Sequence, residues 1–214
     1  MRLLAALLLV ALVLPAAGCQ RAYFGALERI GVEKRDVLVD RVRNARDSQD
    51  EAREQFRSAL DAFSDLVGFD GGDLERTYER LSAEYERSED RAAEVSSRLD
   101  AVQAAAAALF DEWEAELDQY ADQGLRRESE RQLRETRTRY ESMLAAMERA
   151  ERKMPPVLQA FEDQVLFLKH NLNARAIASL EGTVREIETD VDQLVRDMEA
   201  SIAEANAFIE QMRS

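Results

Sequence analysis

The stretch "LERTYERLSAEYERSEDRAAEVSSRLDAVQAAAAALFDEW", residues 74–113, repeats apolar or small side chains at alternating spacings of four and three residues. A repeat of this period keeps one narrow seam of an α-helix facing a partner helix. The seam residues are Leu74, Tyr78, Leu81, Tyr85, Ser88, Ala92, Val95, Leu99, Val102, Ala106, Leu109 and Trp113. Beyond Trp113 the seam shifts to Leu117 and Tyr120, which indicates a local change of phase. The stretch predicts one long helix that packs lengthwise against others.

The segments on either side show the same pattern. Residues 32–67 have a seam of Leu38, Val42, Ala45, Gln49, Ala52, Phe56, Ala59, Phe63 and Leu66. It ends at "GFDGGD", where glycines favour a turn and Asp73 is suited to cap the next helix. After "ADQGL" around Gly124, a third seam comprises Ser129, Leu133, Thr136, Tyr140, Met143, Met147, Ala150 and Met154. We interpret the methionines as core residues and not as metal or haem ligands.

Composition agrees with these periods. Among 214 residues there are 8 Gly and 3 Pro, and Ala, Leu, Glu and Arg dominate. This is the composition of long helices and coiled coils. We therefore predict an all-α fold, an elongated antiparallel up-and-down helical bundle with coiled-coil-like heptad packing, in which residues 32–214 form a single domain.

The position of the third chain reversal is open. Pro155 and Pro156 in "KMPPVL" disfavour helix, yet the apolar pattern resumes at once. A reversal at the prolines would leave the last helix overhanging its neighbours by about 26 residues, roughly 39 Å. If the chain instead bends there and reverses at Gly182, where Thr183 and Glu186 form a capping box, the overhang falls to about seven residues, roughly 10 Å. We favour the second arrangement because an exposed apolar seam is costly.

The N-terminus has the features of an export signal. Arg2 is followed by an uncharged run of twelve residues, too short to span a membrane, and then by small residues. The sequence "LPAAGC" resembles the lipobox of bacterial lipoproteins, in which the cysteine is acylated, with Ala16 where leucine is more usual. Cys19 is the only cysteine, so a disulfide within the chain is impossible. We predict a signal peptide at 1–18 and a lipidated linker at 19–31, in which residues 20–30 can form a short amphipathic helix.

The resemblance also bears on location. Gln20 is not the aspartate that holds lipoproteins at the inner membrane of enteric bacteria. The lipobox resemblance therefore implies an outer-membrane lipoprotein of a Gram-negative bacterium, facing the periplasm. Removing residues 1–18 takes away one arginine and no acid, which changes the formal net charge from −14 to about −15. A surface of that sign repels phosphates, so we expect no nucleic-acid partner.

The stretch "LKHNLNARA", residues 168–176, contains the only histidine in an otherwise acid-rich chain. Two interpretations of His170, Asn171, Asn173 and Arg175 remain open. On one continuous helix these side chains diverge, which favours buried hydrogen bonding that sets helix register. Alternatively, they form part of a small-ligand or partner site near the "GFDGGD" turn.

No motif in the sequence predicts catalysis. With one histidine and no Glu-x-x-His motif, a di-iron bundle is close to excluded, and no glycine-rich phosphate loop or nucleophile motif is present. Haem held by His170 and a methionine is formally allowed, but we predict neither a cofactor nor a metal. Membrane shaping by a basic concave face is disfavoured by the acidic charge.

The chain also resembles a known family along nearly all of its mature length. The matching segments are "YFGALERIGVEKRDVLVDRV", "FDGGDLE", "SERQLRETR", "DQVLFLKHNLNARAIASL" and "MEASIAEANAFI". They are similar to an uncharacterised family of predicted proteobacterial lipoproteins, a helical domain of unknown function. The resemblance implies an exported helical protein and brings no activity. We expect a non-enzymatic lipoprotein that is anchored by acylated Cys19 and binds a protein partner or itself; the alternative is a ligand- or cofactor-binding bundle.

Overall fold

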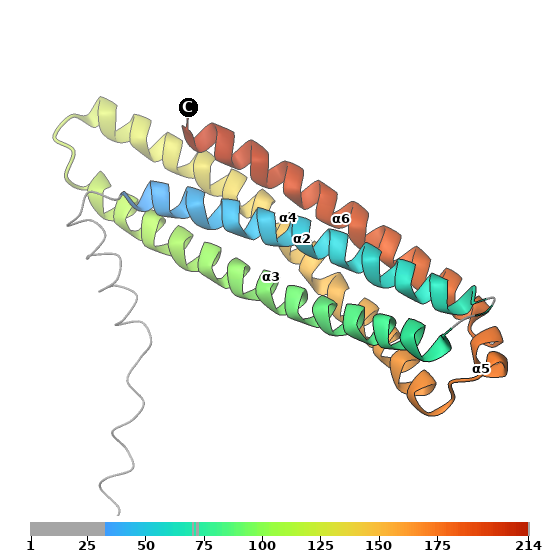
Figure 1. Ribbon diagram of the computed structural model, residues 1–214. Helices are drawn as coiled ribbons and strands as arrows, with labels where there is room; N and C mark the ends of the chain where they lie inside the picture. The colour runs from blue at the N-terminus through green and yellow to red at the C-terminus, as the bar shows by residue number, and fades with distance from the viewer. Residues whose placement is uncertain (1–32, 70, 72, 214) are drawn as a thin grey trace, which may run out of the picture.

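A computed structural model describes residues 33–69, 71 and 73–213, and the described residues form one antiparallel helical bundle (Figure 1). The long helices are α2 (Lys34–Val67), α3 (Leu74–Leu117), α4 (Gln123–His170) and α6 (Glu181–Arg213), and the short helix α5 (Ala174–Ala178) precedes α6. Helix α2 packs against α3 and α6, and α4 packs against the same two helices from the opposite corner. This up-and-down arrangement confirms the predicted fold class. The predicted signal peptide, Cys19 and the short helix at 20–30 lie outside the described residues.

The apolar seams form the core, as their spacing predicts. All nine seam residues of α2, including Gln49, are fully buried, and the eight predicted for the third helix are at most 8% exposed. Phe63 of α2 meets Phe161 of α4 edge to face, with ring centroids 6.2 Å apart. The Tyr140 ring of α4 lies between the rings of Phe110 and Phe208, and its centroid is 5.4 Å from the first and 6.3 Å from the second. Burial, followed by the charges of nearby glutamates, raises the pKa of Tyr140 to about 12.

The first two reversals are closed by aspartate caps. Gly71 adopts a φ of +143°, a conformation that side-chain-bearing residues rarely take, and Asp73 then accepts a hydrogen bond from the Arg76 amide at 3.1 Å. The predicted Asp73 cap is thus confirmed. At the second reversal, Asp122 accepts from the amides of Gly124 and Leu125. Gly124 lies inside the first turn of α4 and not in the break, and a Cβ there would approach the Asp122 carboxylate to 2.9 Å.

Helix α4 runs without interruption through Pro155 and Pro156. Both prolines are exposed, so the carbonyl groups that lose their helical partners lie on the solvent side. Met154 and Val157, next to them, are 1% and 3% exposed. Proline inside a helix costs about 3 kcal/mol, while fully burying one large apolar side chain stabilises by about 1.5–3 kcal/mol. Packing on both sides of the prolines therefore keeps the helix continuous.

The third reversal lies at residues 171–180, between the two predicted positions. A reversal at the prolines is wrong. Of the favoured arrangement, the continuation of the chain past the prolines is confirmed, but its reversal at Gly182 is not. The predicted cap at Gly182 is wrong, because α6 begins at Glu181 and contains Gly182 and Thr183. Asn171 and Asn173 end one helix and start the next, ten residues before the expected break.

Two buried polar groups link the helices at mid-bundle. Gln49 of α2 donates to the Met147 carbonyl of α4 at 3.2 Å and accepts from the Ser201 hydroxyl of α6 at 2.5 Å. Gln49 and Ser201 are both 0% exposed, so this hydrogen-bonded group joins three helices in the dry core. Such a group fixes the register of neighbouring helices.

Candidate functional site

The four residues singled out in the sequence lie together at one end of the bundle. His170 is the last residue of α4, Asn171 and Asn173 form the break, and Arg175 lies on α5. All four are exposed. The prediction that they are buried and set helix register is therefore wrong, because the helix on which it depended ends at His170.

Local hydrogen bonds explain why the chain turns here. The Asn171 side-chain amide donates to the Phe167 carbonyl at 2.9 Å, which satisfies a carbonyl at the end of α4. Asn173 caps α5, since its side-chain oxygen accepts from the Ala176 amide at 3.1 Å. The asparagines are thus helix-terminating residues. As predicted, this end lies beside the "GFDGGD" turn, because α5 packs against α2, whose last residue is Val67 (Figure 1).

The surface of this end, which we call the distal tip (residues 164–180), combines exposed apolar side chains with a lack of acidic residues. Leu166 is 57% exposed and Phe167 is 41% exposed. No acidic residue occurs among these 17 residues, although the chain has 43 Asp and Glu. Lys169 and Arg175 are basic and exposed. The distal tip therefore offers apolar contact area and positive charge, which suits a protein surface better than a metal ion.

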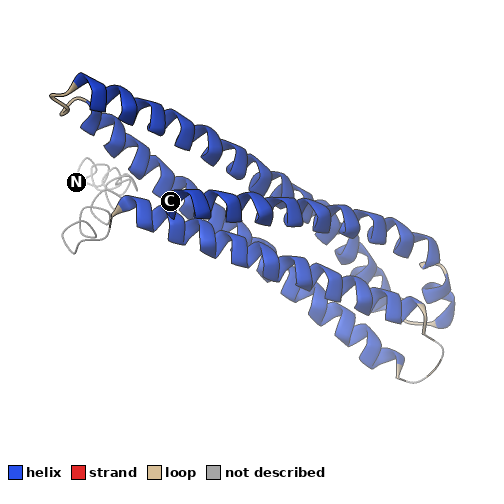
Figure 2. Ribbon diagram, turned by 90° about the horizontal axis from the view of Figure 1, so that it is seen from above, coloured by secondary structure: helices blue, strands red, loops and turns tan. Residues whose placement is uncertain are grey.

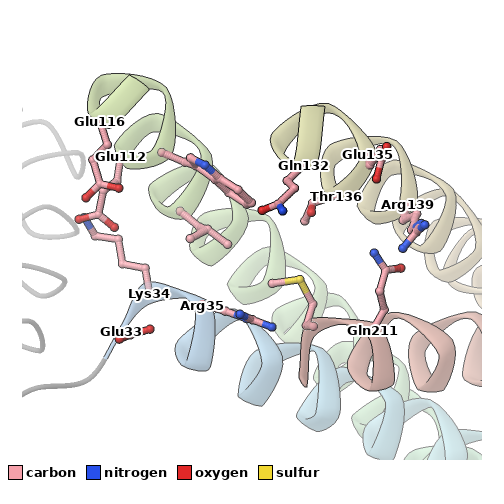
Figure 3. A pocket seen from close by; sticks show the side chains of 13 residues that line it. Glu33, Lys34, Arg35, Glu112, Glu116, Gln132, Glu135, Thr136, Arg139 and Gln211 are labelled. Atoms are coloured by element: carbon pink, nitrogen blue, oxygen red, sulfur yellow. The ribbon is translucent and has the colours of Figure 1, made fainter. Parts of the chain in front are cut away.

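The opposite end contains a crevice that the sequence did not predict. Its volume is about 850 Å³, and all four long helices contribute to it. The side chains that line it are Leu109, Glu112, Trp113 and Glu116 of α3, Gln132, Glu135, Thr136 and Arg139 of α4, Gln211 and Met212 of α6, and Glu33, Lys34 and Arg35 at the start of α2. Figure 3 shows Arg139 and Gln211 reaching toward the same space from α4 and α6.

The floor of the crevice is apolar and its rim is charged. Trp113 is partly buried, and its indole N–H donates to the Ser129 hydroxyl at 2.8 Å, which holds the ring in place. On one wall the Lys34 ammonium pairs with Glu112 at 2.7 Å. Glu135 pairs with Arg131 of the same helix at 3.8 Å. The crevice can therefore accept an amphipathic occupant, with its apolar side against the indole.

One signal in the sequence pointed to this end. The seam of α3 shifts after Trp113, and in the structure α2 begins beside Glu112, so beyond that point α3 no longer has α2 as a neighbour. The crevice itself was not predictable, because it depends on where α2 begins and α6 ends relative to α3 and α4.

The described part of the chain shows neither a metal-binding cluster nor a membrane-spanning helix. No group of three or more His, Cys, Asp or Glu side chains there is placed to hold a metal ion. None of the described helices combines the length and apolarity that crossing a bilayer requires.

The carboxylate of Glu84 is structural. Burial raises its pKa, but hydrogen bonds from Arg87 and Gln55 outweigh the effect of burial, so the pKa lies below the usual value.

Comparison with known proteins identifies the family. A family model described as "Protein of unknown function (DUF2959)" matches residues 23–212. Among curated proteins, none matches the chain. Because the match covers most of the sequence, the chain belongs to this family of unknown function.

Proposed function

We propose that this helical bundle is a non-enzymatic envelope lipoprotein, anchored through acylated Cys19 in the outer membrane of a Gram-negative bacterium. In this proposal it faces the periplasm and binds a protein partner through its distal tip. Neither a cofactor nor nucleic acid takes part. The export signal and the "LPAAGC" motif support the anchor, and the net charge of −14 disfavours a polyanion as partner.

The observation that carries the proposal is the position of the start of α2. Cys19 precedes Lys34 by only fifteen residues, and Lys34 lines the crevice at one end of the bundle. A lipid on Cys19 therefore holds the crevice end near the membrane. Helix α2 has 34 residues, so the distal tip lies roughly 50 Å farther out at about 1.5 Å per residue.

The chemistry of the distal tip supports its role as the partner-binding end. Leu166 and Phe167 are adjacent and more than two-fifths exposed, at 57% and 41%. Buried aromatic side chains are common anchors of protein interfaces, and Lys169 and Arg175 supply charge beside them. The long seams, by contrast, are used within the bundle and leave little apolar surface along its sides.

The non-enzymatic part of the proposal is supported by the structural uses of the polar side chains. Asn171 and Asn173 cap helix ends, and Gln49 and Ser201 connect helices in the core. Each of these groups is accounted for by the fold.

The anchor is tested by labelling cells that express the full chain with radioactive palmitate. We expect the label on the wild-type protein and not on Cys19→Ser, and we expect the wild-type protein in the outer-membrane fraction. A wild-type chain that takes up no palmitate would refute the anchor.

The partner-binding end is tested with a photo-crosslinking amino acid at Phe167. A matched control carries the same group at Glu86, which is exposed on the side of α3. We expect a discrete adduct from position 167 in the intact envelope and a weaker one or none from position 86. An adduct of twice the protein mass would identify a second copy as the partner, and equal labelling at both positions would contradict a dedicated tip.

A further inference from the structure

The crevice arises because two helices of the bundle end before the other two. Helix α2 begins at Lys34 beside Glu112, and α6 ends at Arg213, whereas α3 continues to Leu117 and α4 begins at Gln123. Figure 2 shows the hairpin between α3 and α4 reaching beyond the end of α6. The four-helix cross-section is thus reduced to a pair, and the inner sides of α3 and α4 lose their neighbours.

Apolar side chains continue on the inner side of α3. Trp113 and Leu117 are half-buried and pack against the core, and Leu109 and Met212 form the base of the crevice. The part of α4 that lies beyond the crevice, from Gln123 to Gln132, is about nine residues long, which corresponds to roughly 14 Å of helix. Leu125, near the start of α4, is 59% exposed, and with the half-buried Trp113 and Leu117 it gives this end of the bundle apolar surface for a covering partner.

We propose that the crevice is the docking site of the chain's own residues 20–30. This segment ends three residues before Glu33, which itself lines the crevice. If helical, its eleven residues span about 16 Å, which matches the overhang of α4. On a helix, Tyr23, Phe24, Leu27 and Ile30 share one side and supply an apolar face that fits against the half-buried Trp113.

The extent of the family match supports this occupant. The match to the family model begins at Tyr23, eleven residues before α2, so residues 23–30 of the segment belong to the shared domain. Charge is compatible as well. The crevice is lined by four acidic and three basic side chains, and residues 20–30 contain two arginines and one glutamate.

Covalent attachment favours this segment over a free ligand. A short flexible connection presents a tethered group at an effective concentration on the order of millimolar. A free amphipathic molecule would need to exceed that concentration or bind more tightly. Docking adds a third helix to the pair that α3 and α4 form at the crevice end. The inference does not depend on acylation of Cys19.

The experiment uses Trp113, the only tryptophan in the chain, as a reporter inside the crevice. The mature chain, residues 19–214, is prepared with Cys19→Ser so that neither lipid nor detergent enters the crevice. Leu27→Gln removes an apolar side chain from the docking face, and Arg29→Gln, on the opposite side of the same helix, is the matched control. Circular dichroism confirms that each variant keeps its helical signal.

We expect Leu27→Gln to shift the Trp113 emission to longer wavelength and to increase its quenching by acrylamide, while Arg29→Gln matches the parent chain. A second measurement exploits the absence of other thiols: Leu27→Cys with Met212→Cys forms a disulfide on mild oxidation faster than Arg29→Cys with Met212→Cys. Emission and quenching that are unchanged by Leu27→Gln, or equal disulfide rates in the two pairs, would overturn the proposal.

Discussion

Ser201→Ala is expected to destabilise the bundle more than Gln49→Leu does, although both remove the same hydrogen bond. In Ser201→Ala the Gln49 side-chain oxygen loses its donor, and Gln49 is 0% exposed, so water cannot replace it. Leaving a buried polar atom without a partner costs about 1–3 kcal/mol. The amide of Gln49 still bonds to the Met147 carbonyl, which holds the unsatisfied oxygen in the core.

Gln49→Leu leaves a smaller defect. The Met147 carbonyl lies within α4, where it also accepts the helical hydrogen bond, so it keeps a partner. The Ser201 hydroxyl can turn to a carbonyl of its own helix, a bond that serine commonly makes. We therefore expect a cost of less than about 1 kcal/mol. In Gln49→Leu/Ser201→Ala both partners are apolar, and the cost should be close to that of Gln49→Leu alone.

The assay is urea unfolding followed by circular dichroism, with the two single variants and the double variant forming a thermodynamic cycle. The coupling free energy should fall between about 0.5 and 3 kcal/mol, as it does for residues in direct contact. In thermal unfolding, each kcal/mol corresponds to a change in Tm of about 2–4 °C for a protein of this size. Strictly additive costs, or a larger cost for Gln49→Leu, would show that the buried hydrogen bond does not have the role assigned to it.

Three further predictions concern packing, pH and the prolines. Phe161→Ala, at a fully buried position, should lower the free energy of unfolding by about 3–5 kcal/mol, whereas Phe167→Ala at the distal tip should change it by less than about 0.5 kcal/mol; equal effects in urea unfolding would contradict the assigned burial. The pKa of Glu84 is held below its ordinary value of 4.5, chiefly by Arg87 against the opposing effect of burial, so its contribution to stability is present above pH 4.5 and is lost as pH falls through the lowered pKa. Glu84→Gln should therefore flatten the acid limb of a plot of urea midpoint against pH, and an unchanged limb would count against this linkage. Pro155→Ala restores a backbone donor to α4 and should raise Tm, because a helix gains up to about 3 kcal/mol when proline is replaced by alanine, less about 0.4–1 kcal/mol of unfolded-chain entropy; a lower Tm would mean that α4 needs the proline.

The heptad seams were predictable because their period is a local property. Every α-helix turns by the same angle per residue, so the spacing of Leu38, Val42 and Ala45 specifies one side of the helix whatever it packs against. The Asp73 cap was predictable for the same reason, since the aspartate bonds to an amide only three residues away.

The interpretation of Pro155 and of the asparagines illustrates the limit of local rules. Proline disfavours helix locally, but buried Met154 and Val157 on either side keep α4 continuous. The prediction that Asn171 and Asn173 are polar residues on a buried helix depended on that helix continuing to Leu180. Once α4 ends at His170, the same side chains are exposed caps, and the site assigned to them loses its geometry.

The amino-acid sequence by itself determined the all-α architecture, the inner side of each long helix and the acidic character of the surface, because helical period and charge are properties of the chain. Only the tertiary structure decided where α4 turns into α6, that Gln49 pairs with Ser201, and that a crevice opens around Trp113. These features depend on where helices begin and end relative to one another. That offset is set by the summed packing of residues far apart in the chain, and no local pattern encodes it.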